Sequence, residues 1–578
     1  MHFPLWDHRP IVCIPVDFYM MRWDEGSAGE PSDPAYGTMV KGQPTILRAL
    51  QRRSLHLSSV IEAPKGRIPS PAPFPLSISE RKVILMADIQ KQYGLFIDGA
   101  FVPASDGATF AAHNPANGEE LALFAEATKE DVDRAVKAAR AALPAWSKTS
   151  PVERQNLLLK IADIIDANAD HLALMETLDN GKPIRETKAA DVPLGSDHFR
   201  YFAGCLRAWE GSATMIDDNT MSLVLHEPVG VVGQVIPWNF PFTMACWKLA
   251  PALAAGNTIV IKPSSHTSLS LMEFMRLIQD VLPKGVVNVI TGKGSKSGQW
   301  LLDHPDLDKL AFTGSTEVGH GVYQAACDKL IPCTLELGGK SANIVFDDCD
   351  LSQAIDGACK GILFNQGQVC CAGSRLFVQE GIFDEFLKHL KATFEAVKIG
   401  DPTDPATQLG AQIYKSQQEK VLNYIKIGIE EGATLVTGGK RYTANGCDKG
   451  YFMEPTILVT DKPACRVCQE EIFGPVVVVQ KFKTADEVIA LANDSVYGLG
   501  GAVFSKNINT ALKVARSVRT GRMWVNTYND LPAGAPFGGY KQSGIGRETH
   551  KVMLEHYSQM KNIFINLKDG VSGMYDIR

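Results

Sequence analysis

From residue 229 onward, short apolar runs rich in β-branched residues alternate with helical stretches, and this alternation constrains the fold more than any other feature. The apolar runs occupy residues 230–236, 258–263, 286–291 and 309–314. Apolar residues at helical spacing fill the intervals at about 242–254, 267–281, 295–303 and 317–330. Strands joined by such helices pair in parallel through right-handed crossovers. Because the runs are apolar nearly throughout, we expect helices on both faces of the sheet.

The alternation resumes after Glu336 with a different set of strands and predicts a second α/β domain. These strands are expected at 342–346, 375–379, 475–480, 501–505 and 522–526. Residues 128–180 have helical periodicity. The segment 221–228 alternates like an antiparallel strand, and a late strand is expected at 562–567. Both are candidates for sheet extension between subunits.

The first 85 residues differ from the rest of the chain, since they hold 11 of its 32 prolines. Proline cannot sustain a helix or a central strand. We therefore expect residues 1–85 to be an irregular, disordered leader. Met86 opens an ordinary domain start and is expected to be the natural first residue.

The composition excludes several classes of protein. The 58 basic and 64 acidic residues leave a net charge of −6, which does not favour nucleic-acid binding. Twelve cysteines in 578 residues are too few for a disulfide scaffold, and no secretory signal opens the chain, so we expect a cytoplasmic protein with free thiols. Residues 228–247 carry no charge, but their prolines and amides favour a buried strand, loop and helix over a membrane span. Neither a membrane partner nor a metal site is expected.

Cys370 is the first candidate for chemistry, because glycines flank it and a thiolate is a strong nucleophile. Taken alone, it could equally be a buried structural cysteine. Glu336 lies between apolar residues before two glycines and could be a general base, or a strand-end carboxylate paired with Lys340. Asn239 could donate to a developing oxyanion or satisfy a turn.

Two glycine-rich turns follow predicted strands. The run GSTEVG at 314–319 lies between a strand and a helix, where backbone amides can approach a phosphate-bearing ligand. The run GKGSKSG at 292–298 is placed similarly, but neither is the usual dinucleotide fingerprint.

In order and spacing, these elements resemble the NAD(P)-dependent aldehyde dehydrogenase family from about Tyr93 to Leu567. The most specific motifs are IPWNFP (236–241), KP (262–263), FTGSTEVG (312–319), LELGGKSANIV (335–345), FNQGQVCCAGSR (364–375), EEIFGPV (470–476) and PFGGYKQSGIGRE (536–548). Within the family, DNGKPIRET (179–187), DHFRYFAG (197–204) and GIGRETHK (544–551) look closest to bacterial acetaldehyde or short-chain aldehyde dehydrogenases.

The resemblance implies a mechanism. Cys370, not Cys371, matches the family's nucleophile, Asn239 its oxyanion donor, and Glu336 the base that activates water to hydrolyse a thioester. Lys248 and Glu548 match its possible proton-relay pair.

The family's cofactor and substrate positions also carry over. The implied NAD or NADP site comprises Ile236, Trp238, Lys262, Ser265, Gly294, Gly298, Gly314, Ser315, Gly319, Leu337, Glu471 and Phe473. The implied substrate pocket comprises Phe240, Met244, Trp247 and Phe537, and its lack of arginine favours a small neutral aldehyde such as acetaldehyde. Many NAD-preferring relatives have Glu where this chain has Ser265. Its loss removes repulsion toward a 2′-phosphate, so we expect both cofactors to be accepted.

The resemblance also implies an aldehyde dehydrogenase-like α/β fold with a Rossmann-type cofactor domain, a second α/β catalytic domain and a small bridging sheet. The expected cofactor domain spans 86–209 and 229–337, the catalytic domain 338–555, and the bridging or oligomerisation element 210–228 and 556–568. A homodimer or a homotetramer is expected.

Three alternatives stay open. A CoA-acylating relative would not need the base Glu336. A cysteine hydrolase would pair Cys370 with a histidine, for which His198, His266, His304 and His320 are available. An inactive structural relative is the third.

Overall fold

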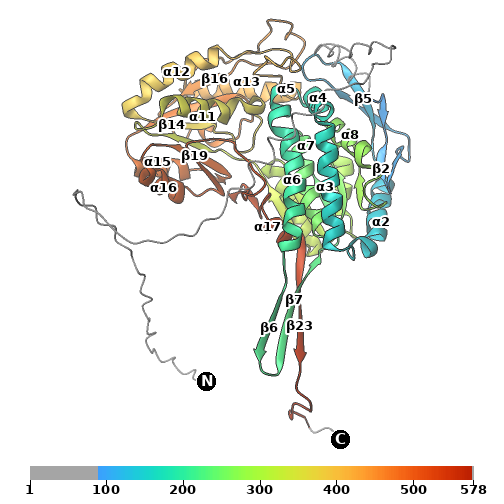
Figure 1. The fold of residues 1–578 in the computed structure, drawn as a ribbon. Helices are drawn as coiled ribbons and strands as arrows, with labels where there is room; N and C mark the ends of the chain where they lie inside the picture. The colour runs from blue at the N-terminus through green and yellow to red at the C-terminus, as the bar shows by residue number, and fades with distance from the viewer. Residues whose placement is uncertain (1–88, 576–578) are drawn as a thin grey trace, which may run out of the picture. The chain divides into compact units, whose positions relative to one another are not determined.

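The computed structural model describes residues 89–575 (Figure 1). The predicted leader 1–85 and the predicted start at Met86 lie outside these residues. Within the described range the main elements are two parallel-rich sheets with their helices, a helical layer, and an antiparallel arm.

The first sheet has eight strands in the order β22-β12-β11-β8-β9-β10-β2-β3. Its parallel strands are β8 (Val231–Val235), β9 (Thr258–Lys262), β10 (Val287–Val289), β11 (Lys309–Thr313) and β12 (Cys333–Glu336). The antiparallel edge strands are β2 (Leu95–Ile97), β3 (Ala100–Val102) and β22 (Gly544–Ile545). The four strands predicted between 230 and 314 are confirmed, whereas the edge strands are too short for their pattern to be read.

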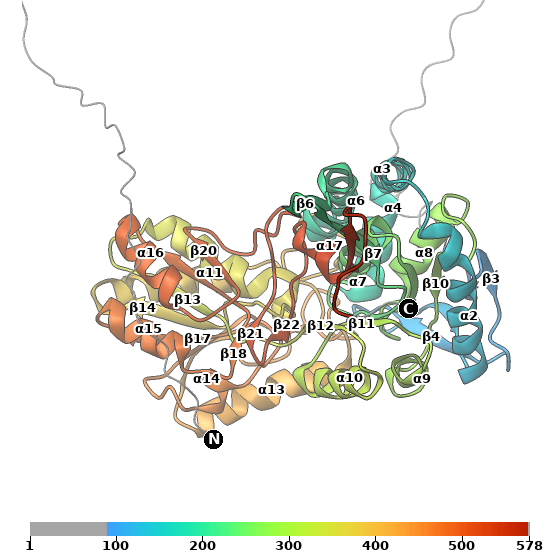
Figure 2. The ribbon, with the colours of Figure 1, turned by 90° about the horizontal axis from the view of Figure 1, so that it is seen from below.

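Helices cover both faces of this sheet, as predicted from its apolar strands. They are α2 (Lys129–Trp146), α3 (Pro151–Ala167), α6 (Val192–Cys205), α7 (Pro241–Ala254), α8 (Leu269–Ile278), α9 (Gln299–Asp303) and α10 (Thr316–Lys329). Figure 2 shows α2, α9 and α10 on one side of the sheet and the other four on the opposite side. Successive residues of β9 enter different cores, with Ile259 and Ile261 packing toward α7 and α8 and Val260 packing toward α2.

The uncharged stretch at 228–247 forms β8, a loop and the start of α7, as expected. Within the described part of the chain, no helix combines the length and the apolar character that a membrane span needs.

The second sheet has seven strands in the order β15-β16-β17-β14-β13-β19-β20. They are β13 (Ala342–Val345), β14 (Arg375–Gln379), β15 (Thr434–Thr437), β16 (Thr456–Val459), β17 (Val476–Phe482), β19 (Gly500–Phe504) and β20 (Arg522–Val525). All pair in parallel except β15, which is antiparallel at the edge. Its helices are α11 (Leu351–Leu363), α12 (Phe383–Glu395), α13 (Lys415–Glu430), α15 (Ala485–Asn493) and α16 (Ile508–Ser517). The five predicted strands are confirmed.

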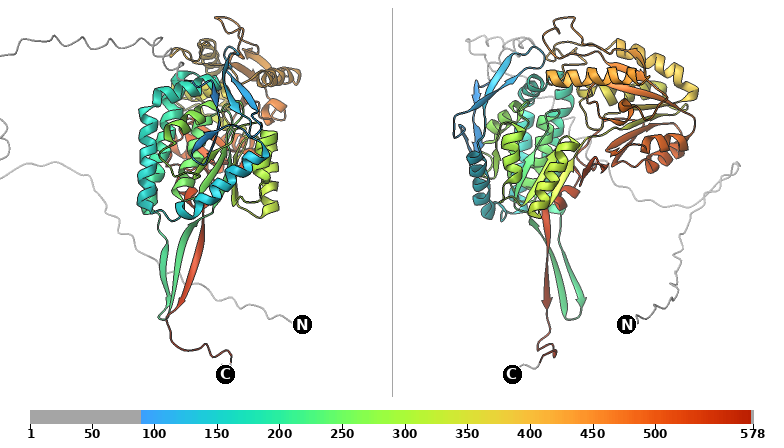
Figure 3. Two further views of the ribbon diagram at one scale, coloured as in Figure 1. Left: turned by 90° about the vertical axis from the view of Figure 1, so that its right-hand side faces the viewer. Right: turned by 180° about the vertical axis from the view of Figure 1, so that it is seen from behind.

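An antiparallel arm joins chain segments that are far apart in sequence. It consists of β6 (Ser212–Asp217), β7 (Thr220–Pro228) and β23 (Ser558–Asn566) in the order β23-β7-β6. Figures 1 and 3 show these strands extending away from the helices and sheets. The strands expected at 221–228 and 562–567 are therefore present, and they pair with each other.

A smaller sheet and a helix lie at the start of the described chain. The sheet is formed by β1 (Gln92–Tyr93), β5 (Glu120–Ala125) and β4 (Thr109–His113), and α4 (Ala169–Asn180) follows α3. The helices of this region begin at clear signals, since capping boxes form between Thr128 and Asp131 and between Ser150 and Glu153.

Glu273 of α8 joins strand β1 to helices α4 and α8 through its hydrogen bonds. Its buried carboxylate accepts hydrogen bonds from Tyr93, from His171 Nε2 at 2.7 Å and from Arg276 Nη2 at 2.8 Å. Burial opposes ionisation, but these hydrogen bonds prevail and lower the pKa of Glu273 to about 2.

We expect Glu273→Gln to destabilise the protein by on the order of 2 kcal/mol at pH 7, because hydrogen bonds to an ionised group are lost. Because the folded pKa lies below the usual value of 4.5, the stabilisation is present above pH 4.5 and disappears as the pH falls toward 2. Thermal midpoints measured between pH 7 and pH 3 should therefore converge for the two proteins. Asp280→Asn, at an exposed position just past the end of α8, is the control. A deficit that is independent of pH would contradict the assignment.

Candidate active site

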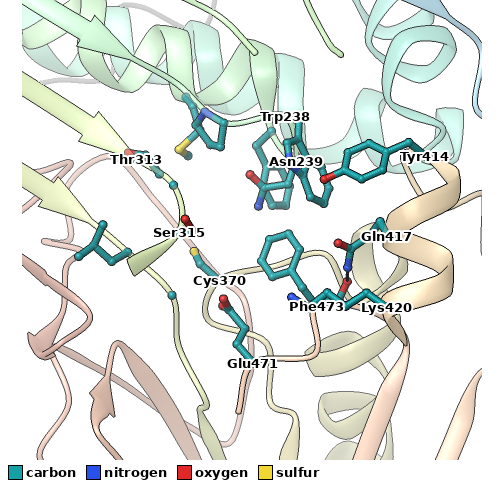
Figure 4. Close-up of a pocket in the computed structure, with 16 residues that line it drawn as sticks. Trp238, Asn239, Thr313, Ser315, Cys370, Tyr414, Gln417, Lys420, Glu471 and Phe473 are labelled. Atoms are coloured by element: carbon teal, nitrogen blue, oxygen red, sulfur yellow. Dashed lines mark hydrogen bonds between the residues drawn. The ribbon is translucent and has the colours of Figure 1, made fainter. Parts of the chain in front are cut away.

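A cavity of about 220 Å³ opens where strands β8, β11 and β12 of the first sheet end (Figure 4). Its walls come from the segments that follow these strands, from the loop that carries Cys370, from α13 and from residues 471–473. The carboxyl ends of parallel strands are where α/β folds bind ligands. The residues that line it are Pro237, Trp238, Asn239, Phe240, Met244, Thr313, Gly314, Ser315, Leu337, Gly338, Cys370, Tyr414, Gln417, Lys420, Glu471 and Phe473.

Cys370 lies in the wall of this cavity, on the loop between α11 and β14. Gly367 has φ of 72°, and a Cβ there would lie 2.1 Å from the carbonyl oxygen of Gly474, so only glycine fits. A hydrogen bond with Cys371 and then burial raise the pKa of the Cys370 thiol well above its usual range. Both effects oppose formation of the thiolate, which is the nucleophilic form of the side chain.

Asn239 extends from the loop between β8 and α7 into the same cavity (Figure 4). Its Nδ2 donates to the carbonyl oxygen of Gln368 at 2.9 Å, which fixes the amide. Only one of its two N–H groups is used by this bond, so the other can donate to a ligand.

Glu336 ends β12, and its side chain is buried with only 4% exposed. Neither carboxyl oxygen has a hydrogen-bond partner among the described residues, and the same holds for Lys340 Nζ. In the part of the chain that the structure describes, Glu336 and Lys340 therefore do not pair, and that alternative is wrong. Burial, followed by the charges of Glu548 and Cys370, raises the pKa of Glu336 well above its usual value.

Lys248 and Glu548 form an ion pair of 2.5 Å in which both side chains are only 1% exposed. Lys248 lies on α7, and Glu548 lies in the segment between β22 and α17 (Val552–His556). The Oε2 atom of Glu548 has no partner among the described residues. Because the charge of Glu548 raises the pKa of Glu336, these buried carboxyl groups interact electrostatically.

Six of the predicted cofactor residues line the cavity: Trp238, Gly314, Ser315, Leu337, Glu471 and Phe473. Glu471 Oε1 accepts from the backbone N–H of Gly339 at 3.0 Å, and burial raises the pKa of this carboxyl. The rings of Trp238 and Phe473 meet edge to face at 5.2 Å. Ser315 caps α10, whose first-turn N–H groups suit an anionic ligand.

The other predicted cofactor residues lie outside the cavity wall. Lys262, at the end of β9, is buried, and burial lowers its pKa to about 8. Its stem lies beside Gly298, and its carbonyl oxygen accepts from Ile236 N at 3.1 Å. Gly294 starts the turn Gly294–Gly298, and Gly319 lies within α10. Ser265 is half-buried in the loop after β9.

The four predicted substrate-pocket residues divide into two pairs. Phe240 and Met244 line the cavity, and Phe240 stacks on Phe364 at 5.8 Å. Trp247 and Phe537 are buried outside that lining and meet edge to face at 5.6 Å.

The sequence prediction missed six lining residues: Pro237, Thr313, Gly338, Tyr414, Gln417 and Lys420. The first three adjoin predicted residues. The last three recur every third residue at the start of α13, so they share one face of that helix. This spacing is visible in the sequence, but nothing there indicates that the face meets Cys370.

Within residues 89–575, the four histidines considered for a cysteine hydrolase have other surroundings. His198 Nδ1 meets the carbonyl oxygen of Leu194 at 2.6 Å, and His304 meets Asp133 at 3.3 Å. The ring of His266 packs at a tilt against that of Tyr414, with centroids 4.5 Å apart, and His320 is exposed. Across residues 89–575, no hydrogen bond joins any of the four to Cys370.

Known proteins resemble this chain over most of its length. Residues 101–563 match the family model described as the aldehyde dehydrogenase family. An aldehyde dehydrogenase of Deinococcus radiodurans is 48% identical over 491 residues, which are 84% of this chain and 95% of the relative.

Solved structures are equally similar. The NAD+ complex of a Bacillus cereus aldehyde dehydrogenase is 43% identical with a TM-score of 0.82, covering 84% of this chain and 99% of the other. A Staphylococcus aureus betaine aldehyde dehydrogenase with NAD+ is 40% identical with a TM-score of 0.84, covering 87% of this chain and all of the other. The chain therefore belongs to the aldehyde dehydrogenase family and is an oxidoreductase that acts on aldehydes.

Proposed function

We propose that the protein oxidises a small neutral aldehyde, such as acetaldehyde, to its carboxylic acid with NAD or NADP and water. The observation that carries this proposal is the placement of Cys370 and Asn239 in one cavity. The buried carboxyl group of Glu336 directly precedes the lining residue Leu337 in the chain and has no hydrogen-bond partner among residues 89–575. A nucleophile, an oxyanion donor and a base are the three groups that thioester chemistry needs.

The chain's residues fit the nicotinamide cofactor. The capped start of α10 at Ser315 would hold the pyrophosphate, and Glu471, fixed by Gly339 N–H, would accept hydrogen bonds from a ribose. Lys262 would hold the other ribose. When bound, the cofactor supplies the oxidant that accepts the hydride of the aldehyde carbon.

The residues then have distinct tasks. The Cys370 thiol loses its proton to solvent water, and the resulting thiolate adds to the carbonyl carbon, while the Asn239 amide and the Cys370 backbone N–H stabilise the oxyanion. Loss of hydride leaves an acyl thioester on Cys370. Glu336 takes a proton from water, which attacks the thioester and releases the acid and the thiol. Lys248 and Glu548, which form a buried ion pair of 2.5 Å, would then carry the proton away.

This assignment favours hydrolysis over acyl transfer to CoA, because a general base is needed to activate water and is not needed for a CoA thiol. A small neutral substrate is supported by Phe240 and Met244 in the cavity wall and by the absence of arginine among its lining residues within 89–575. The NAD+ complexes of the Bacillus cereus and Staphylococcus aureus proteins support a nicotinamide cofactor here.

We also propose that the arm formed by β6, β7 and β23 joins subunits into a homodimer or homotetramer. The support is a set of exposed apolar side chains on strands at the sheet edges: Met215, Ile216, Met560, Ile563 and Phe564. Such an edge is a template for pairing with another chain.

We also propose a cytoplasmic location, because the reducing environment there would keep the Cys370 thiol free.

The nucleophile can be tested by two neighbouring substitutions. We expect Cys370→Ser to lower kcat at least about 1,000-fold, because a serine hydroxyl is a far weaker nucleophile than a thiol near neutral pH. The dissociation constant for NAD, measured by protein fluorescence, should change little. Cys371→Ser is the matched control and should retain activity within about threefold. Loss of activity only in the Cys371 variant would overturn the assignment.

Glu336→Gln should separate the two half-reactions. We expect a rapid burst of reduced cofactor close to one per active site, followed by turnover slowed about 100- to 10,000-fold, because deacylation has lost its base. Wild-type deacylation should also rise with pH through the raised pKa of Glu336, since only the ionised carboxylate accepts a proton. The variant should lack this dependence. Normal steady-state turnover in Glu336→Gln would require another base.

Cofactor choice can be tested at Ser265, where no carboxylate opposes a 2′-phosphate. We expect kcat/KM for NAD and for NADP to differ by less than about 1,000-fold, or roughly 4 kcal/mol. Ser265→Glu should lower kcat/KM for NADP at least about tenfold and leave that for NAD nearly unchanged, while Ser265→Gln is the neutral control. A wild-type preference for NAD above that limit would refute dual use.

A further inference from the structure

One side chain joins the two loops that carry the proposed oxyanion donors. Asn365 Nδ2 donates to the backbone carbonyl oxygen of Asn239 at 2.7 Å and to that of Gln368 at 3.1 Å. Because Asn239 Nδ2 also donates to the Gln368 carbonyl at 2.9 Å, the three residues form one closed set of hydrogen bonds. This set connects positions that are 126 residues apart in sequence.

The backbone at Asn365 has an unusual conformation. Asn365, Gln366 and Gly367 are consecutive residues with φ of 47°, 54° and 72°. A left-handed residue other than glycine costs roughly 1–2 kcal/mol. Asparagine tolerates this region better than most residues, but glutamine does not share that preference. Such a turn persists only where surrounding contacts determine it.

Those contacts are buried and specific. Asn365 and Gln366 are fully buried, and the backbone N–H of Asn365 donates to Glu186 Oε2 at 2.9 Å. The side chain of Gln366 points elsewhere, donating from Nε2 to the carbonyl oxygen of Ala411 at 3.0 Å. The bridge to Asn239 is therefore particular to Asn365, although both residues share the strained turn.

The far side of the Asn239 loop is also held. Asn180 Nδ2 donates to the carbonyl oxygen of Trp238 at 2.7 Å. Lys182, fully buried and paired with Asp191 at 2.6 Å, lies 4.1 Å from the ring centroid of Phe240. Asn180 Nδ2 also approaches the carbonyl oxygen of Asn239, at 3.4 Å. The bond from Asn365 to that oxygen is shorter, at 2.7 Å, and together with the bond from Asn239 Nδ2 to Gln368 it ties Asn239 to the loop that carries Cys370.

We propose that Asn365 is a positioning residue, which sets the Asn239 amide against Cys370 so that both donate to one substrate oxygen. This rests on the proposed function of Asn239. Asn365 does not line the cavity and touches no reacting atom. It acts because a loop displaced by about 1 Å can cost a factor of about 100 in rate.

The test compares Asn365→Gly with Gln366→Gly. Both relieve the same left-handed conformation and remove a buried amide, but only the first removes the bridge. We expect kcat/KM for acetaldehyde to fall about 100-fold in Asn365→Gly and to stay within about threefold in Gln366→Gly. Asn365→Asp, which keeps the size of the side chain but places a carboxyl group against two carbonyl oxygens, should lose as much as the glycine variant. The dissociation constant for NAD should be unchanged throughout.

A double-mutant cycle decides whether Asn365 acts through Asn239. On an Asn239→Ala background, Asn365→Gly should cost at least fivefold less in kcat/KM than it costs in the wild type. A smaller difference, or a similar loss in Gln366→Gly, would overturn the proposal and leave Asn365 a structural residue. Wild-type activity in Asn239→Ala alone would instead overturn the role of Asn239 in the proposed function.

Discussion

The site depends on the register between the paired strands β11 and β12, because this register fixes which residues stand at the ends of the two strands. Thr313 is paired with Glu336, and the N–H of Gly314 donates to the Glu336 carbonyl at 3.0 Å. This pairing brings the start of α10, the carboxyl group of Glu336 and the glycines after it to one edge of the sheet. A shift by one residue would turn Glu336 to the opposite face and away from Cys370.

The same edge concentrates charge that the fold must bury. Lys248 and Glu548 neutralise each other at 2.5 Å, whereas Glu336 has no hydrogen-bond partner among residues 89–575. An unpaired buried carboxyl group is costly when ionised, which is why its pKa is raised. The burial that makes ionised Glu336 costly for the fold also makes its carboxylate a stronger base, which is the property that the proposed role requires.

The sequence predicted the architecture well where strands are long and apolar on both faces, as in β9 and β17. It could not predict β2, β3 or β22, because two or three residues carry no periodicity. Cys370, Asn239 and Glu336 were found through motif resemblance, and the structure places Cys370 and Asn239 in one cavity. The sequence could not decide whether Glu336 pairs with Lys340. The two residues are four positions apart, and the surrounding apolar residues and glycines are compatible with a Glu336 side chain that points toward Lys340 or away from it.

The residues that were missed share a physical reason. Gln417 and Lys420 reach the cavity because α13 packs across the second sheet toward the first, and this approach is set by long-range packing. Asn365 lies in a motif that was recognised, yet its partners Glu186 and Asn239 are 179 and 126 residues away. Its left-handed backbone is compatible with the sequence but not required by it. A local pattern can therefore identify candidate reacting groups, whereas the surroundings of a residue such as Asn365 are defined by contacts between distant segments.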